Sequence, residues 1–391
     1  MFIWFEYVFD SQTGSGSPKS RKITRPKRNS RNAVRRSSDV GEKSIAALHL
    51  SLNTTRSISQ LIFVGGMPRS GTTLVRSILD AHPDVRCGQE THVIPRLLDI
   101  RKKWRSMNEN TTRLDNAGVN DTVLDSAMAA FILEIIGSHG ATASRLCNKD
   151  PLALVHSEYL SQLFPEAKFV FVIRDGRAVA HSIMSRKITI SGINLNDPQN
   201  VLMNWNSTLT RLYHECYLVG QARCFPIYYE QLVLYPRDQL NALLRFLDLP
   251  WDESVLHHEK FIGSKIILSK NEKSTDQVDK PIYRDALTQW VGKFSAEIVA
   301  NMRTIAPMLK QLGYDPDENP PNYGQLDESA ASQGSPWARR HGRAGQYVRH
   351  YHWKRHIERI FVEGKHFKPI DRVVKPDRIS LGLFQLANQI L

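Results

Sequence analysis

The residues best suited to binding an anion lie in the loop after a short apolar run. Residues 61–64 are of strand type, and residues 72–79 have the apolar spacing of a helix. The first N–H groups of a helix lack intrahelical partners, and the helix dipole favours negative charge there. The loop between them adds a forked cation, backbone N–H groups and hydroxyl donors: Arg69, Ser70, Gly71, Thr72 and Thr73. The stretch therefore predicts an anion-binding strand–loop–helix unit.

A second set of anion-binding residues follows the apolar run 168–173. Arg174 comes directly after this expected strand, where side chains project into the ligand crevice of a parallel sheet. Ser182 and Arg186 are four residues apart, so they share one face of the helix that follows. Two such sites suit a nucleotide with two separated anionic groups. For any one of these residues considered alone, the alternative to an anion site is a solvent-exposed surface that carries arginine.

The first loop is close to a nucleotide triphosphatase loop but lacks its lysine. Gly66 and Gly71 have the required spacing, yet Thr72 and Thr73 stand where such an enzyme needs lysine followed by serine or threonine. Without the lysine, a γ-phosphate and its magnesium would lack their usual partner. A kinase or NTPase is therefore disfavoured. A tight turn with hydroxyl caps stays open as the non-functional interpretation of this loop.

The positive charge of the chain is concentrated at its ends. The 391 residues carry a formal charge of +13, but the excess lies in residues 1–39 and 337–391. Charged tails of this kind suit solvent or an anionic surface. Residues 341–356 interleave aromatic and cationic side chains, as single-strand binders do, so a non-catalytic nucleic-acid-binding protein is a competing hypothesis. No stretch approaches the roughly 20 apolar residues of a membrane span.

The cysteines and glycosylation triplets give mild evidence about the compartment. The four cysteines show no zinc-like spacing, and we expect no metal. Four Asn-x-Ser/Thr triplets mildly favour a secretory compartment. They begin at Asn53, Asn110, Asn120 and Asn206.

Expected strands alternate with expected helices, which indicates parallel β-α-β units with the ligand at the C-terminal strand ends. We expect further helices over 121–136, 158–163, 178–186, 205–219, 237–247 and 298–312, a strand over 225–229, and a polar loop over 269–281. The helix over 121–136 should have one apolar side, formed by Val123, Leu124, Met128, Phe131, Ile132 and Ile135. The predicted class is an α/β, P-loop-like fold with a mainly parallel sheet. It comprises one catalytic domain over 59–325, a basic and flexible segment over 1–58, and a basic, largely irregular tail over 326–391.

With both anion sites in view, residues 62–323 closely resemble the tyrosylprotein sulfotransferases. The matching segments begin at Phe63 (FVGGMPRSGTT), Leu79 (LDAHPDVRCGQET), Cys147 (CNKDP), Arg174 (RDGRA), Tyr228 (YYEQL), Ser274 (STDQV) and Asn319 (NPPNYG). They separate this chain from cytosolic and carbohydrate sulfotransferases. A sugar sulfotransferase is the nearest alternative within the enzyme class, and a panel of acceptors would separate the two.

The resemblance implies an activity and a setting. It implies sulfuryl transfer from 3′-phosphoadenylyl sulfate (PAPS) to tyrosine hydroxyls in acidic motifs of secretory and membrane proteins, leaving adenosine 3′,5′-bisphosphate. It implies a homodimeric type II membrane protein of the trans-Golgi lumen, with no required metal and no nucleic-acid partner. It also implies two disulfides, pairing Cys87 with Cys147 and Cys216 with Cys224, which suit an oxidising lumen.

The resemblance also assigns site residues. Glu90 is the expected base, and Lys149 and Ser274 are the expected transition-state stabilisers. The cofactor residues are Arg69, Ser70, Gly71, Thr72, Thr73, Arg174, Ser182, Arg186, Tyr229, Ser274, Thr275, Asp276, Gln277, Val278, Asp279, Lys280, Pro281, Ile282, Tyr283 and Gln289. The peptide residues are His92, Val93, Ile94, Pro95, Arg96, Leu97 and Arg113. His92 replaces a family arginine and Gln289 a family lysine, which predicts a softer or pH-dependent preference for acidic substrates and one weaker phosphate contact.

Overall fold

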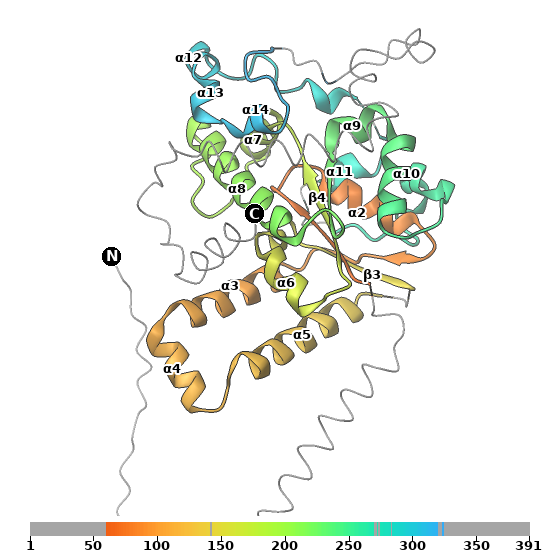
Figure 1. The fold of residues 1–391 in the computed structure, drawn as a ribbon. Coiled ribbons are helices and arrows are strands. Elements are labelled where there is room, and N and C mark those ends of the chain that lie inside the picture. The colour runs from red at the N-terminus through yellow and green to blue at the C-terminus, as the bar shows by residue number, and fades with distance from the viewer. Residues whose placement is uncertain are drawn as a thin grey trace, which may run out of the picture. The chain divides into compact units, whose positions relative to one another are not determined.

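The chain forms a five-stranded parallel sheet with helices on both faces (Figure 1). This computed structural model describes residues 60–140, 143–269, 272, 274–282, 284–319 and 323. The strand order is β2-β3-β1-β4-β5, and every neighbouring pair is parallel. The strands are β1 (Ile62–Gly66), β2 (Val85–Arg86), β3 (Arg145–Lys149), β4 (Lys168–Ile173) and β5 (Cys224–Tyr228). The parallel sheet confirms the predicted α/β class.

Helices connect the strands and continue after the last one. The helices of the first half are α2 (Thr72–Ala81), α3 (Val93–Ser106), α4 (Asn108–Asn116), α5 (Asp121–Gly137), η1 (Pro151–His156), α6 (Ser157–Leu163) and α7 (Gly176–Ser185). Those of the second half are α8 (Pro198–Val219), α9 (Tyr229–Leu234), α10 (Pro236–Phe246), η2 (Glu253–Leu256), η3 (His258–Phe261), α11 (Thr275–Val278), η4 (Asp285–Leu287), α12 (Ala296–Ala300), α13 (Met302–Ile305) and α14 (Met308–Gln311).

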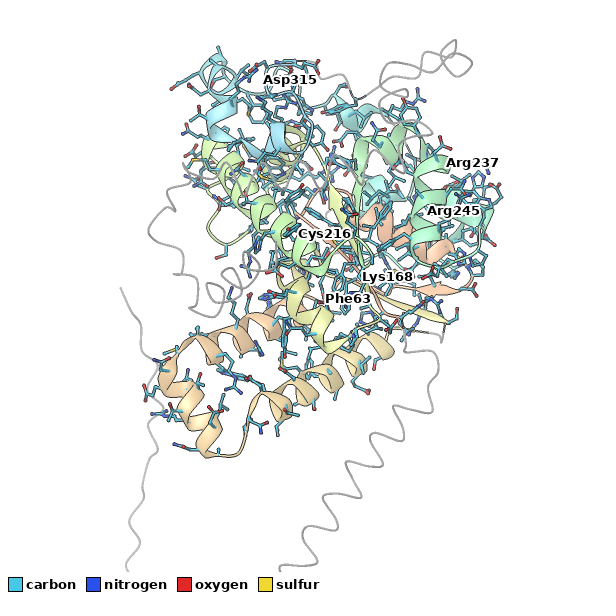
Figure 2. All side chains as sticks on the ribbon, in the orientation of Figure 1. Phe63, Lys168, Cys216, Arg237, Arg245 and Asp315 are labelled. Atoms are coloured by element: carbon cyan, nitrogen blue, oxygen red, sulfur yellow. A yellow bond between two sulfur atoms is a disulfide. The ribbon has the colours of Figure 1, made fainter. Side chains whose placement is uncertain are left out.

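Alternate residues of the central strands enter two separate cores. Phe63 and Phe169 face the layer of α5, α6 and α8, and their rings stack with centroids 5.5 Å apart. Ile62 and Val64 face the opposite layer, which includes α2, α9 and α10. Figure 2 shows Phe63 inside the fold and Arg237 and Arg245 projecting outward from α10. Because successive strand residues point to opposite faces, a strand covered on both sides is apolar throughout.

The apolar face expected for the helix over 121–136 is partly wrong. The structure buries Leu124, Met128, Ile132 and Ile136, which follow one another at intervals of four. Two residues expected on that face, Val123 and Phe131, have exposed fractions of 49% and 44%. A helix this rich in apolar residues offers two overlapping stripes, and packing against the sheet selects only one of them.

The single helix expected over 298–312 is also wrong. The structure has three short helices there, α12, α13 and α14, interrupted at Asn301 and at Ala306. Ala306 precedes Pro307, and a residue before proline is pushed out of the α region. Its φ of −135° and ψ of 64° show this directly. The loop expected over 269–281 contains α11, a helix of one turn.

The remaining expected helices and strands are present with shifts of a few residues at their ends. The helix expected from Trp205 begins earlier, at Pro198, with the Asp197 side chain as its N-cap. No helix of the described residues is both long and apolar enough to cross a bilayer. Residues 1–59 and 324–391 lie outside the described residues, so the predicted tails, and with them the domain boundaries, stay predictions.

Candidate active site

The predicted anion loop lies between β1 and α2 with its donors turned inward. Ser70, Thr72 and Thr73 are all buried. The Ser70 Oγ atom has no hydrogen-bond partner among the described residues. Gly71 is the N-cap of α2 at a φ of 103°, and a Cβ there would collide with the ring of Tyr229. The backbone therefore approaches this site as closely as only glycine allows, and the buried hydroxyl is a donor available to an anion.

Arg69 links this loop to two other segments. Its Nε atom donates to Ser182 Oγ at 3.0 Å, and one Nη atom donates to Gln277 Oε1 at 2.8 Å. The other Nη atom donates to Ser274 Oγ. Arg174 in turn donates to the backbone oxygen of Arg69 at 3.1 Å. The two predicted anion sites therefore adjoin each other through the Arg69 side chain.

Two neighbouring pockets contain most of the predicted cofactor residues. The first is lined by Arg69, Gly71, Thr73, Leu74, Arg174, Tyr229, Ser274, Gln277, Val278, Lys280, Pro281 and Ile282. The second is lined by Arg174, Ala178, His181, Ser182, Ser185, Arg186, Gln277, Ala286, Gln289 and Trp290. Tyr283 and the side chains of Thr275 and Asp276 lie outside the described structure.

Arg174 belongs to both pockets and is held on two sides. Its guanidinium carbon lies 4.3 Å from the centre of the Tyr229 ring, and one Nη atom donates to the Ala286 backbone oxygen at 2.7 Å. Its buried Nε atom has no hydrogen-bond partner among the described residues. A fixed arginine with a donor still to be satisfied suits a phosphate oxygen.

Glu90 and Lys149 meet beside the anion loop. Lys149 is the last residue of β3, and its fully buried ammonium forms an ion pair with Glu90. The same ammonium lies 3.4 Å from Thr73 Oγ1. Burial raises the pKa of Glu90, although the charge of Lys149 works in the opposite direction. The structure thus brings the expected base and the expected lysine to one hydroxyl of the loop.

A second carboxylate, which the sequence did not single out, shares this lysine. Glu272 Oε2 lies 3.2 Å from Lys149 Nζ and 3.2 Å from Thr73 Oγ1. Its Oε1 atom accepts the backbone N–H of Glu90 at 3.3 Å. Burial alone would raise the pKa of Glu272, but Lys149, Arg76 and the Glu90 N–H together lower it. Glu272 therefore carries its negative charge within the site.

The predicted peptide residues separate into two places. His92 is the N-cap of α3, and its Nδ1 atom lies 3.3 Å from Glu90 Oε1. The first turns of α3 carry Val93, Ile94, Pro95, Arg96 and Leu97, of which Ile94 is buried and Arg96 exposed. Arg113 instead lies on α4, paired with Glu109 on the same helix. Figure 1 places α4 at the end of α3 and α5 that is farther from the sheet.

One group of side chains has the composition of a metal site. The ligand atoms of Glu90, His92 and Asp150 lie within 4.8 Å of one another. The oxygens of Asp150 already accept four hydrogen bonds, from the Thr91 and His92 N–H groups, the Thr91 hydroxyl and the Asn148 amide. A carboxylate with its lone pairs used in this way is a poor ligand. We assign no metal to this group, and the absence of a required metal stays a prediction.

Both predicted disulfides are present. Cys87 is bonded to Cys147, and Cys216 to Cys224. The first bond joins the segment after β2 to β3, and Cys87 also donates its N–H to buried Asp80 at 2.5 Å. The described residues contain no free cysteine. The pairing implied by the resemblance is therefore confirmed.

Comparison with known proteins agrees with this geometry. A family model described as the sulfotransferase family matches residues 61–253. Protein-tyrosine sulfotransferase A of Caenorhabditis elegans is 51% identical over 275 residues, which are 70% of this chain and 72% of that protein. Protein-tyrosine sulfotransferase 1 of Homo sapiens is 52% identical over 68% of this chain and 73% of its own length.

Solved structures show a weaker likeness, from which we draw nothing. The sulfotransferase domain of the Synechococcus PCC 7002 olefin synthase is 22% identical with a TM-score of 0.47, covering 66% of this chain and 95% of its own. The assignment rests on the curated relatives, which are 51% and 52% identical over 70% and 68% of this chain. The segment matched by the family model contains the anion loop, Glu90 and Lys149. The chain belongs to the protein-tyrosine sulfotransferases.

Proposed function

We propose that this enzyme transfers the sulfuryl group of PAPS to tyrosine hydroxyls of protein substrates, with Glu90 as the base. The observation that carries the proposal is the Glu90–Lys149 ion pair, which lies against Thr73 of the anion loop. In-line transfer to a phenol requires a base, a buried cation and a hydroxyl donor at one point. The Ser70 hydroxyl and the Arg174 guanidinium each have a buried donor with no hydrogen-bond partner in the part of the chain that the structure describes, so they fit the anionic groups of the nucleotide.

The reaction forms a bond between the phenolic oxygen and sulfur and breaks the bond between sulfur and the bridging phosphate oxygen. The phenolic proton passes to the Glu90 carboxylate, whose raised pKa brings it closer to that of a phenol. Lys149 donates to the oxygens on which negative charge builds as the phosphate departs. Ser274 is assigned the same task, and its hydroxyl is held by Arg69 at the edge of the first pocket.

The substrate and the cellular setting are proposed from the family resemblance. We assign acidic tyrosine motifs of secretory and membrane proteins to the surface around His92 and Arg96, next to Glu90. Two disulfides favour the oxidising lumen of the Golgi apparatus. Homodimerisation and membrane association are proposed on the resemblance alone.

The test is transfer of labelled sulfate from PAPS to an acidic tyrosine peptide by wild type and Glu90→Gln. Glu272 remains beside Lys149 in this variant, so no buried charge loses its only partner. Loss of a general base predicts a fall in kcat of about 100-fold or more. A peptide with phenylalanine for tyrosine controls for the acceptor, and Glu297→Gln on exposed α12 is the matched charge control. Full activity of Glu90→Gln would exclude Glu90 as the base. Failure of the wild-type protein to bind PAPS would exclude the proposed reaction.

A further inference from the structure

Glu272 lies at the point on which the donors of the anion loop converge. The Thr73 hydroxyl and the Lys149 ammonium both reach its Oε2 atom, each at 3.2 Å. The Glu272 side chain is only 11% exposed, and Lys149 is fully buried. These two donors belong to different segments, the start of α2 and the end of β3, and a single oxygen of Glu272 satisfies both.

An oxygen of a transferring sulfuryl group needs the same donors. The proposed reaction, on which this inference rests, places the sulfuryl group between the anion loop and Lys149. A carboxylate oxygen and a sulfuryl oxygen are both anionic acceptors of similar size, so they compete for one ammonium and one hydroxyl. Two like charges a few ångströms apart in a partly buried site repel each other strongly.

We propose that the Glu272 carboxylate is an internal ligand of the sulfuryl-binding position and must leave Thr73 and Lys149 when PAPS binds. Glu272 then weakens binding of the sulfuryl group and does not change the binding of the rest of the nucleotide. The pockets assigned to that remainder contain Arg174, Ser182 and Arg186, whereas Glu272 lines neither pocket.

The experiment compares two nucleotides that differ only in the sulfuryl group. Binding of PAPS and of adenosine 3′,5′-bisphosphate to the full chain is measured by calorimetry, without an acceptor peptide. Glu272→Gln keeps the size of the side chain and removes its charge. We expect this variant to bind PAPS about tenfold more tightly than wild type, equivalent to about 1.4 kcal/mol, and to bind the bisphosphate within about threefold of wild type.

Two controls protect this comparison. Glu297→Gln removes the same charge from α12, which contributes no residue to either pocket, and should change neither affinity. Glu272→Ala removes the carboxylate and its hydrogen bonds together, and should favour PAPS over the bisphosphate in the same direction. A bisphosphate affinity within about threefold of that of wild type shows that each variant is folded.

Three results would overturn the inference. Weaker PAPS binding by Glu272→Gln would mean that Glu272 stays in the loaded site and positions Lys149. An equal gain for both nucleotides would mean a general charge effect that does not depend on the sulfuryl position. Unchanged affinity for both would mean that the carboxylate does not compete. Failure of wild type to bind the bisphosphate would instead count against the proposed function itself.

Discussion

Glu230 is a buried acid whose protonation should control the stability of the fold near neutral pH. It lies at the start of α9, and its carboxyl group accepts the Asp175 N–H at 2.9 Å and the Tyr314 hydroxyl at 2.7 Å. Burial, reinforced by the charge of Asp175, raises the pKa of Glu230 from 4.5 to about 7. The folded chain therefore favours the protonated acid more strongly than the unfolded chain does.

The size of the effect follows from linkage between protonation and folding. The interval between 4.5 and about 7, at about 1.36 kcal/mol per pH unit, corresponds to about 3 kcal/mol of unfolding free energy. This stability is fully present below about pH 4.5 and is lost as the pH rises through about 7. About 2.5 kcal/mol of the loss falls between pH 5 and pH 8.

The perturbation is Glu230→Gln, which removes the titration and keeps the shape of the side chain. The assay is urea unfolding followed by tryptophan fluorescence, with the disulfides intact, between about pH 5 and about pH 8. Wild type should lose about 2.5 kcal/mol relative to the variant across this interval. Glu297→Gln on exposed α12 should leave the wild-type pH dependence unchanged. Parallel pH profiles for wild type and Glu230→Gln would refute the reasoning.

Two further perturbations test the loop and the disulfides. Gly71→Ala should abolish binding of adenosine 3′,5′-bisphosphate in calorimetry and leave binding of an adenosine control unaffected. The new methyl group would collide with the Tyr229 ring, and the φ of 103° at this position disfavours alanine. Normal binding of the bisphosphate would contradict this. Replacing Cys87 and Cys147 by serine should lower the unfolding free energy in urea by about 4 kcal/mol, against about 2.5 kcal/mol for the other pair, because the loops span 60 and 8 residues. A larger loss for the short loop would contradict the chain-entropy argument.

The anion loop and the sheet could be predicted from the sequence because their signals are local. Residues 61–64 are apolar without alternation, which is typical of a strand covered on both faces, and Gly71 stands where the helix begins. The disulfide pairing and the role of Glu90 came from family resemblance, since spacing alone leaves the pairing of four cysteines open.

Other features depend on packing between distant segments and could not be predicted. Glu272 is an acid in a polar loop, and its contact with Lys149 joins residues 123 positions apart. Val123 and Phe131 share helical spacing with the residues that α5 buries, so only the docked sheet decides which stripe is covered. The helix break before Pro307 could have been predicted from the proline itself, but the prediction of a single helix over 298–312 did not use it.

The bond between Cys87 and Cys147 has a consequence for how this enzyme can vary. Glu90 follows Cys87 by three residues and Lys149 follows Cys147 by two, so the disulfide joins the proposed base and its lysine partner through a short covalent path. All of α3, α4 and α5 lies within the loop that this bond closes. The chain therefore enters and leaves this group of three helices at one place, which the disulfide fixes. A change in the length or sequence of the outer portion of these helices, around α4, would therefore leave the spacing between Glu90 and Lys149 held by this bond.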